Sequence, residues 1–257
     1  MKKLIVAVMI GTLLTGCSTN KDNPFLQVYD TPFSVPPFDK IKTEHYLPAF
    51  REGIKTHQKE IDAIAENSEA PTFANTVEAL DFSGELLKKV SSVFFNLYST
   101  DTNDKMEAIA NEVTPLLTEH SDNLYLNKAL FQRIKTLYDK RSTLGLNAEQ
   151  IRLLEKYYKN FVRNGAALND EQKERLREIN KQLSLAELQF GQNVLAETNA
   201  YQKWITDEKE LVGLPENVKQ SAAEAAKEAG REGQWLFTTK KASFIPVLQY
   251  SENRELR

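Results

Sequence analysis

An unbroken helical pattern of apolar residues in the second half of the chain constrains the fold most strongly. No proline occurs between residues 169 and 206. Within this stretch, apolar side chains recur at steps of three and four residues, at Leu176, Ile179, Leu183, Ala186, Phe190 and Val194. Such steps place the side chains on one face of an α-helix. At 1.5 Å per residue the segment forms a helix of ~50 Å, which favours a fold built from long helices.

The flanking segments show further helix signals. Residues 147–150 and 169–172 each place Asn where a helix begins and Gln three residues later, a pairing that caps the first turn. A second apolar stripe, Val77–Leu97, predicts a helix capped by Asn75, with Glu78 reaching back. Further helices are predicted over 43–66, 103–120, 124–140 and after Pro215, the last ending at Gly230.

One segment departs from the helical pattern. Residues 234–239 are aromatic and β-prone, and they predict a short strand. The low content of Gly and Pro, 10 and 9 of 257 residues, excludes collagen-like and mostly-β architectures. The predicted fold class is therefore all-α, with at most that strand. The net charge of −3 gives no electrostatic basis for a nucleic-acid partner.

The first residues have the pattern of a secretory signal. A Lys-Lys pair precedes an apolar run over residues 4–14, which is too short to span a bilayer. Thr-Gly then leads to Cys17, the single cysteine, and this ending resembles the bacterial lipobox; the alternative is a plain signal with a chance cysteine. We expect cleavage before Cys17 and lipid attachment to it, which anchors the protein durably to a membrane. Ser18 lacks the Asp that resembles an inner-membrane retention signal, which favours the outer membrane of a bacterial cell envelope.

The chain therefore divides into three predicted parts. Residues 1–17 are the lipoprotein signal with its lipobox. Residues 18–38 begin as a polar tether and continue as an arm in which prolines alternate with aromatic residues, a composition typical of extended chain. Residues 39–257 form the helical body.

Three histidines, His45, His57 and His120, are the candidates for metal binding. None begins an H-E-x-x-H sequence, in which two imidazoles one helical turn apart hold zinc and the Glu acts as general base. His45 and His57 are too far apart for that motif, and His120 has no partner at helical spacing. Each is interpreted as a core, capping or surface residue. Cys17 belongs to no Cys–His pair, so we predict no catalytic and no metal-binding residue in this chain.

Short phrases distributed over the body carry a family resemblance. They are Pro37–Ile41, Glu44–Phe50, Ala70–Phe73, Ser83–Leu87, Val93–Leu97, Pro115–His120, Leu130–Lys135, Phe161–Ala166, Phe190–Leu195, Gly213–Pro215 and Tyr250–Arg257. In this order the phrases resemble the amino-terminal part of peptidyl-dipeptidases in the thimet-oligopeptidase-like family of zinc metallopeptidases. The likeness covers nearly everything after the polar tether.

The resemblance implies a fold and an activity. Members of the family have two largely helical halves around a deep channel that admits short peptides, and they use zinc to remove carboxy-terminal dipeptides. Their zinc motif lies beyond the part that this chain resembles, so no zinc ligand and no general-base Glu is carried over to a residue here. The helices of this chain are expected to form part of the channel wall.

Arg257 is expected to lie within a helix, because no capping Gly, Asn or Pro follows. The interpretation is an amino-terminal portion whose carboxy-terminal catalytic half is missing, and which has no peptidase activity alone. The alternative is a self-contained, lipid-anchored helical binding or scaffold protein without catalytic activity.

Overall fold

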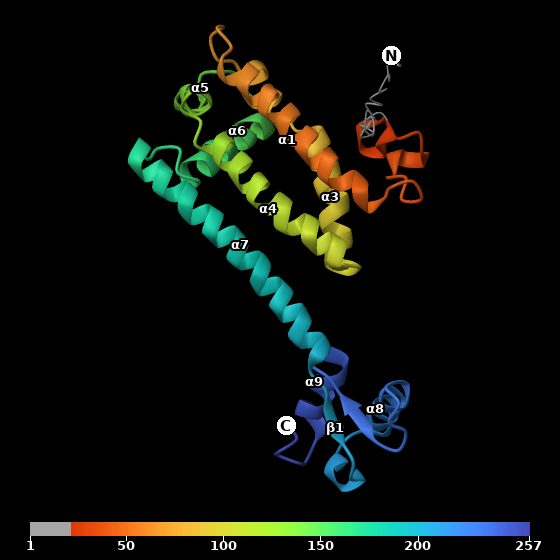
Figure 1. Ribbon diagram of the computed structural model, residues 1–257. Coiled ribbons are helices and arrows are strands. Elements are labelled where there is room, and N and C mark those ends of the chain that lie inside the picture. Colours follow the sequence, from red (N-terminus) through yellow and green to blue (C-terminus); the bar gives the residue numbers. More distant parts are fainter. Residues whose placement is uncertain (1–21) are drawn as a thin grey trace, which may run out of the picture. The chain divides into compact units, whose positions relative to one another are not determined.

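The computed structural model describes residues 22–257 (Figure 1). These residues fall into two compact units, which meet in sequence between Lys181 and Gln182. The structure is mainly helical with one two-stranded antiparallel sheet, so the predicted fold class is confirmed. Cys17 and the whole predicted signal lie outside the described residues. Within residues 22–257, no helix combines the length and the apolar character needed to cross a membrane.

The first unit contains most of the helices. The predictions for 43–66, 103–120 and 124–140 are confirmed by α1 (Thr43–Ala65), α4 (Asp104–Tyr125) and α5 (Lys128–Asp139). Both predicted pairs of Asn and Gln exchange reciprocal hydrogen bonds, and they open α6 (Ala148–Arg163) and α7 (Asp170–Ala200).

The segment before α1 is not wholly extended. Two short 3-10 helices, η2 (Pro24–Leu26) and η3 (Pro32–Ser34), interrupt it. Phe25 is buried in η2, whereas the side chain of Phe33 in η3 is 99% exposed. The segment therefore packs on the first unit through η2. The proline-containing stretch that follows includes a turn, η3, as well as extended chain.

The helix predicted to start at Asn75 and reach Leu97 is interrupted. A π-helical turn, η4 (Phe73–Glu78), and the short α2 (Ala79–Asp81) precede α3 (Glu85–Thr100). Gly84 marks the break with φ +72°, a left-handed conformation that glycine reaches without a steric penalty. The predicted cap is also wrong: Thr72 caps the segment, and the Oδ1 of Asn75 accepts from the Thr72 amide at 2.8 Å.

Helices α1, α3 and α4 form the frame of the first unit (Figure 1). α1 and α3 approach closely at Gly53, where a Cβ would lie 3.0 Å from the Cα of Leu87. Aromatic rings fill the space beside this contact: the ring centroid of Phe94 lies 5.1 Å from that of Tyr46 and 5.4 Å from that of Phe50, both edge-to-face. This packing fixes α1 against α3 and so positions the side chains further along α1.

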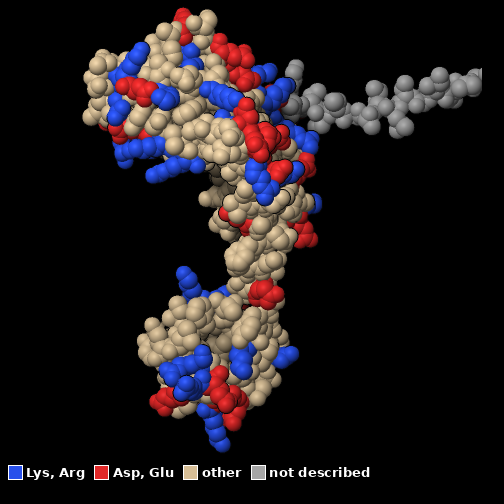
Figure 2. Space-filling view, turned by 90° about the vertical axis from the view of Figure 1, so that its left-hand side faces the viewer, with Lys and Arg blue, Asp and Glu red and all other residues tan. Residues whose placement is uncertain are grey.

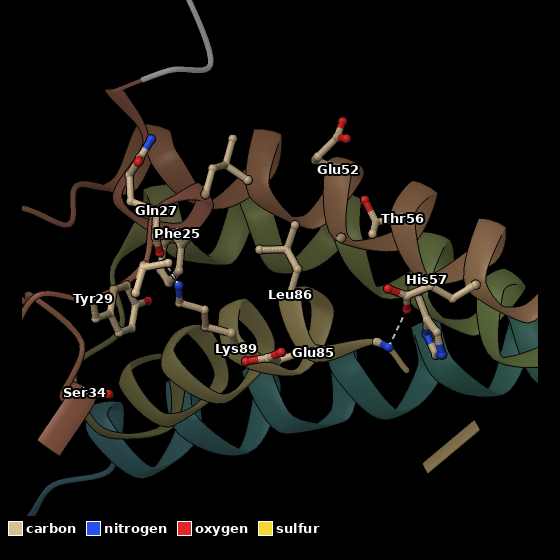
Figure 3. A pocket seen from close by; sticks show the side chains of 15 residues that line it. Phe25, Gln27, Tyr29, Ser34, Glu52, Thr56, His57, Glu85, Leu86 and Lys89 are labelled. Carbon is tan, nitrogen blue, oxygen red and sulfur yellow. Dashed lines mark hydrogen bonds between the residues drawn. The ribbon is translucent and has the colours of Figure 1, made fainter. Parts of the chain in front are cut away.

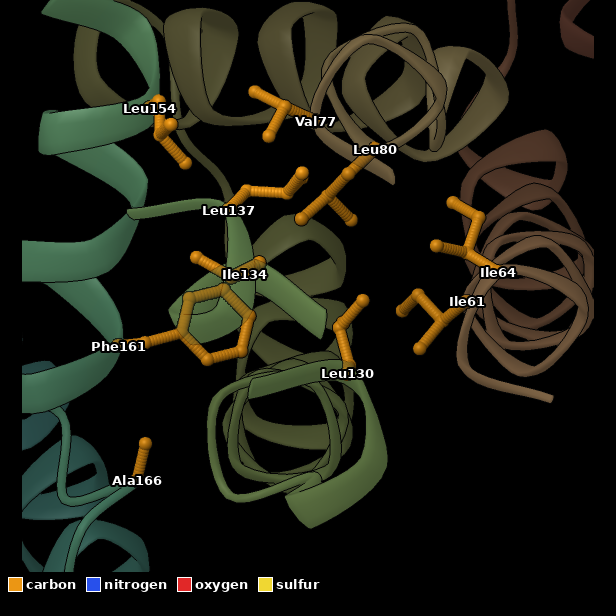
Figure 4. Close-up of a cluster of buried hydrophobic side chains, with 10 residues drawn as sticks. All are labelled: Ile61, Ile64, Val77, Leu80, Leu130, Ile134, Leu137, Leu154, Phe161 and Ala166. Atoms are coloured by element: carbon orange, nitrogen blue, oxygen red, sulfur yellow. The ribbon is translucent and has the colours of Figure 1, made fainter. Parts of the chain in front are cut away.

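A separate apolar core joins α1 to η4, α2, α5 and α6 (Figure 4). It consists of Ile61, Ile64, Val77, Leu80, Leu130, Ile134, Leu137, Leu154, Phe161 and Ala166. At the end of α6, Gly165 adopts φ +91° and the amide of Ala166 donates to the carbonyl of Phe161 at 2.9 Å. This bond and the left-handed glycine close the carboxy-terminal end of α6 with a cap and a turn.

In the second unit, α7 ends at Ala200 instead of continuing to Thr206. Residues Lys203–Ile205 form β1, which pairs antiparallel with β2 (Trp235–Phe237), the predicted strand. β1 has only three residues and follows shortly after a long helix. A segment this short does not show the period-two alternation of a strand, so the sequence pattern did not predict β1.

The remaining elements of the second unit are η5 (Glu208–Leu211), α8 (Glu216–Glu228) and α9 (Lys241–Tyr250). α8 begins after Pro215 and is followed by Gly230 at φ +80°, as predicted. The expectation of a helix at Arg257 is wrong, because α9 ends at Tyr250 and the residues after it form irregular chain and a turn.

Candidate functional site

The chain brings His57 and His120 together, although neither has a histidine nearby in sequence. His57 lies on α1 and His120 on α4. The Nε2 of His120 is 2.9 Å from the Nδ1 of His57, and the ring centroids are 4.8 Å apart. His120, interpreted from the sequence as a core, capping or surface residue, is buried, and its partner lies on another helix instead of at helical spacing. Helical spacing could not reveal the pair, because its members belong to different helices.

Ser83 extends this contact and fixes the order of donors and acceptors. Its Oγ lies 3.1 Å from the Nε2 of His57 and donates to the carbonyl of Leu80 at 2.7 Å. A backbone carbonyl can only accept and a hydroxyl has one proton, so the Oγ of Ser83 accepts from Nε2–H of His57. The Nδ1 of His57 then accepts from Nε2–H of His120. His57 is therefore the neutral Nε2–H tautomer, and His120 carries its proton on Nε2.

Gly84 and Glu60 hold the same turn against α1. The amide of Gly84 donates to Oε2 of Glu60 at 2.7 Å. A Cβ on Gly84 would lie 2.9 Å from Cε1 and Nδ1 of His57, so only glycine lets the turn approach the ring this closely. The phrase Ser83–Leu87 thus contains a hydrogen-bond partner of His57 followed by the residue that packs on its ring.

Burial controls the protonation of this cluster. Burial, and to a smaller extent the neighbouring His57, lowers the pKa of His120 from 6.5 to about 4. Burial also lowers the pKa of His57, while the charge of Glu60 acts in the opposite direction. His120 is 5% exposed, and its Nδ1 has no hydrogen-bond partner among the residues that the structure describes. Both rings therefore favour the neutral form.

The cluster does not form a nucleophilic site. A catalytic serine needs its proton directed to a base and amide donors free to stabilise an oxyanion. Here the proton of Ser83 is directed to Leu80, and the adjacent amide of Gly84 is bonded to Glu60. The geometry indicates a structural joint between α1, the 82–84 turn and α4.

The described residues do not fit the zinc that the resemblance implies. No group of three or more His, Cys, Asp or Glu side chains within residues 22–257 is arranged to hold a metal ion. The facing nitrogens of His57 and His120 are bonded to each other. The third histidine, His45, caps α1, where its Nδ1 accepts from the amide of Lys42 at 3.0 Å, as one of the sequence interpretations proposed.

A pocket of about 910 Å³ adjoins His57 on the side of α3 (Figure 3). Leu86, Val28 and other apolar side chains form part of its wall, together with Glu52 and Glu85. Lys89 extends along the pocket, donates to the carbonyl of Gln27 at 2.7 Å and lies 3.6 Å above the ring of Tyr29. The volume is that of a small-molecule site, and its lining is mixed rather than dominated by one charge.

Charges of both signs are also intermingled on the surface. Figure 2 shows Lys and Arg side chains interspersed with Asp and Glu on the face that it displays. Ion pairs such as Arg175 with Glu178, at 2.8 Å, are exposed to solvent. This face presents no extended field of one sign.

Comparison with known proteins identifies the relatives of the chain. Residues 50–173 match the family model described as Neurolysin/Thimet oligopeptidase, N-terminal domain. The chain is 37% identical over 235 residues to dipeptidyl carboxypeptidase of Escherichia coli (strain K12), an alignment that covers 91% of this chain and 34% of the relative. The dipeptidyl carboxypeptidase of Salmonella typhimurium is also 37% identical over 91% of the chain and 35% of its own length.

A second group of relatives is less similar. Oligopeptidase A of Escherichia coli is 30% identical over 91% of this chain and 34% of its own length. The chain thus spans about a third of the length of the curated relatives it matches. It is a homologue of the dipeptidyl carboxypeptidases and corresponds to the amino-terminal part of the thimet oligopeptidase family.

Proposed function

We propose that this chain is the amino-terminal helical part of a peptidase that removes carboxy-terminal dipeptides from short peptides. The alignment with dipeptidyl carboxypeptidases over 91% of the chain is the observation that carries this proposal. The matching family model, the N-terminal domain of the thimet oligopeptidases, lies within the first unit. We assign the helices of the chain to the wall of a channel that admits short peptides and excludes folded proteins.

The chemistry of the family requires zinc, and residues 22–257 do not fit that ion. The zinc ligands and the general base of the proposed enzyme therefore belong to its carboxy-terminal part. In this proposal the first third of the protein binds and confines the peptide and performs no bond-breaking step. The chain alone should release no dipeptide.

An exposed apolar stripe on α7 is the surface where we expect the carboxy-terminal part to pack. Leu183, Phe190 and Val194 are 51%, 70% and 48% exposed, and their spacing places them on one face of the helix. The segment 182–200 contains only two charged residues, Glu187 and Glu197, and the exposed part of α7 is correspondingly pale in Figure 2. An exposed apolar stripe of this kind is typical of a surface that is covered in the assembled protein.

A chimera tests the proposal. In it, this chain replaces the corresponding first third of the Escherichia coli dipeptidyl carboxypeptidase, and release of the carboxy-terminal dipeptide from a blocked tripeptide is measured. We expect zinc-dependent release by the chimera and none by this chain or by the remaining two-thirds of the enzyme alone. A chimera that is folded and loaded with zinc but does not cleave would contradict the assignment.

We also propose that the protein is attached by lipid at Cys17 to the outer membrane of a bacterial cell envelope. The support is the sequence around Cys17: a basic start, a short apolar run and small residues before the single cysteine. Anchoring would place the peptide-binding part outside the cytoplasm, where short peptides arrive from solution.

The alternative function is that of a lipid-anchored helical binding protein without catalytic activity. The pocket of about 910 Å³ beside His57 is the observation in its favour. The chimera separates the two: a binding protein unrelated in function would not restore cleavage, even when its helices are intact.

A further inference from the structure

The histidine pair is placed where three segments of the chain meet. His57 contributes both ring nitrogens, one to Ser83 in the turn before α3 and one to His120 on α4. Because the chain of hydrogen bonds starts at a carbonyl that can only accept, all its protons point the same way. This series of hydrogen bonds ends at Nδ1 of His120, a buried acceptor with no donor among the described residues.

A proton added to this series of hydrogen bonds has no favourable nitrogen to bind while the two imidazoles stay paired. On Nδ1 of His120 it would create a buried N–H facing no acceptor in the present arrangement. On Nδ1 of His57 it would set two N–H groups against each other across 2.9 Å. Either position makes an unpaired buried charge, which is costly unless the structure rearranges.

The pocket on the far side of His120 offers an acceptor for that rearrangement. It has a volume of about 400 Å³ and is lined by both His120 and Gln58. The Nε2 of Gln58 donates to Asp62 at 2.8 Å, which orients its Oε1 as the free end. That Oε1 is buried and, like Nδ1 of His120, has no partner in the described part of the chain.

We propose that the His57–His120 pair is a proton-operated joint: one added proton separates the two imidazoles, turns Nδ1–H of His120 to Oε1 of Gln58, and loosens α4 and the 82–84 turn from α1. The neutral form couples the three segments, and the protonated form exchanges a His–His bond for a His–Gln bond. The pocket beside His57, to which Gly84 also contributes, changes its wall in the same step.

The charged groups around the pair set the direction of the response. On the side of His57 they are Glu60, Glu52, Glu85 and Lys89. On the side of His120 they are Lys55, Lys59 and Glu119. Glu60 is bonded to the amide of Gly84 and favours protonation of His57, but burial outweighs it. The lowered pKa values of both rings agree with a joint that stays closed at neutral pH and opens in acid.

Nitrogen-15 NMR of the histidine rings tests this joint on the full chain carrying Cys17→Ser, which prevents lipid attachment. The chain has three histidines, and His45→Gln identifies the third signal and serves as the control outside the joint. We expect His57 and His120 to be neutral Nε2–H tautomers at pH 7, and His120 to remain so to about pH 5. Titration of either ring near 6.5, or an Nδ1–H tautomer, would overturn the proposal.

Two further measurements address the rearrangement. Below the pH at which the pair takes up a proton, the Overhauser contacts between the two rings should disappear. Amide exchange in the 82–84 turn and in α4 should then rise at least tenfold after correction for intrinsic rates. Gln58→Met removes the waiting acceptor at similar volume and should lower the pH of the transition by about one unit. Unchanged exchange after protonation, or an unchanged transition in Gln58→Met, refutes the proposed movement.

Discussion

The guanidinium of Arg133 is buried on α5 and donates from Nη2 to the Oδ1 of Asn75 at 3.0 Å. Its Nη1 also donates to the carbonyls of Asn67 at 2.8 Å and Glu69 at 3.0 Å. One side chain thus satisfies the loop that leads from α1 into η4. The Oδ1 of Asn75 accepts a second hydrogen bond, from the amide of Thr72, so it joins Arg133 to the start of η4.

Replacing Arg133 with Leu should destabilise the first unit by about 3 kcal/mol. The substitution removes the donor to the part-buried carbonyls of Asn67 and Glu69, and a hydrogen bond to a charged group contributes about 1.5–3 kcal/mol. Urea unfolding followed by circular dichroism gives the change. Arg175→Leu is the matched control, because Arg175 pairs with Glu178 in solvent and its loss should cost about 0.5 kcal/mol or less. Equal effects of the two substitutions would show that the Arg133 network contributes nothing special.

Replacing Gly84 with Ala should cost about 2–3 kcal/mol and displace the ring of His57. The left-handed backbone accounts for about 1 kcal/mol, and a Cβ placed 2.9 Å from the ring accounts for the rest. Gly145→Ala separates the two contributions, since Gly145 has φ +65° with no atom within 4 Å of its Cβ position. Calorimetric melting of both variants measures the difference between their losses of stability. This difference vanishes if only the left-handed backbone conformation matters.

Local signals in the sequence predicted the helices well. Asn147 and Gln150 lie three residues apart, so their reciprocal bonds can be anticipated without knowledge of the fold. Asn75 and Glu78 have the same spacing, but the nearby Thr72 is the residue that caps, and Gly84 breaks the stripe that continued across it. A periodic stripe does not show a break when apolar residues on both sides keep the same phase.

The contacts of the joint could not be predicted, because they connect residues far apart in sequence. The resemblance did mark some of these positions without explaining them. The phrase at Gly213, which lies outside the joint, is a similar case: its φ is +86°, and a Cβ there would collide with the carbonyl oxygen of Tyr250 in the last shared phrase. The structure gives such phrases a packing reason, which differs from the catalytic reason that a family resemblance first suggests.

The stability of the first unit should fall as the pH falls from about 6.5 to 4. The pKa of His120 is lowered from 6.5 to about 4 in the folded chain, so the unfolded chain binds more protons between these values. Stability from this group is therefore fully present above pH 6.5 and is lost as the pH approaches 4, by at most about 3 kcal/mol. Unfolding free energies between pH 4 and 8 give the slope. His45→Gln should retain the slope and His120→Asn should reduce it; the reverse result contradicts the assignment to the pair.

Attachment of lipid should depend on the thiol of Cys17. In a bacterial host, radiolabelled fatty acid should enter the full chain, and Cys17→Ser should abolish both the label and membrane sedimentation. The thiol is the attachment atom in the proposed modification, and the hydroxyl does not replace it. Ser18→Ala is the control, because it leaves the thiol intact and should keep the label. Label that persists in Cys17→Ser would exclude the lipobox interpretation.

The apolar stripe of α7 should matter for assembly and not for the stability of this chain. Leu183 and Phe190 are 51% and 70% exposed, so a double change to Glu removes little buried surface and should alter the unfolding free energy of the chain by about 0.5 kcal/mol or less. In the chimera with the Escherichia coli enzyme, the same change places two carboxylates in an apolar interface and should reduce dipeptide release at least tenfold. Gln189→Glu adds a charge on a different face of the helix and should leave cleavage within about twofold. If the double variant cleaves like the unaltered chimera, the stripe does not pack against the catalytic part.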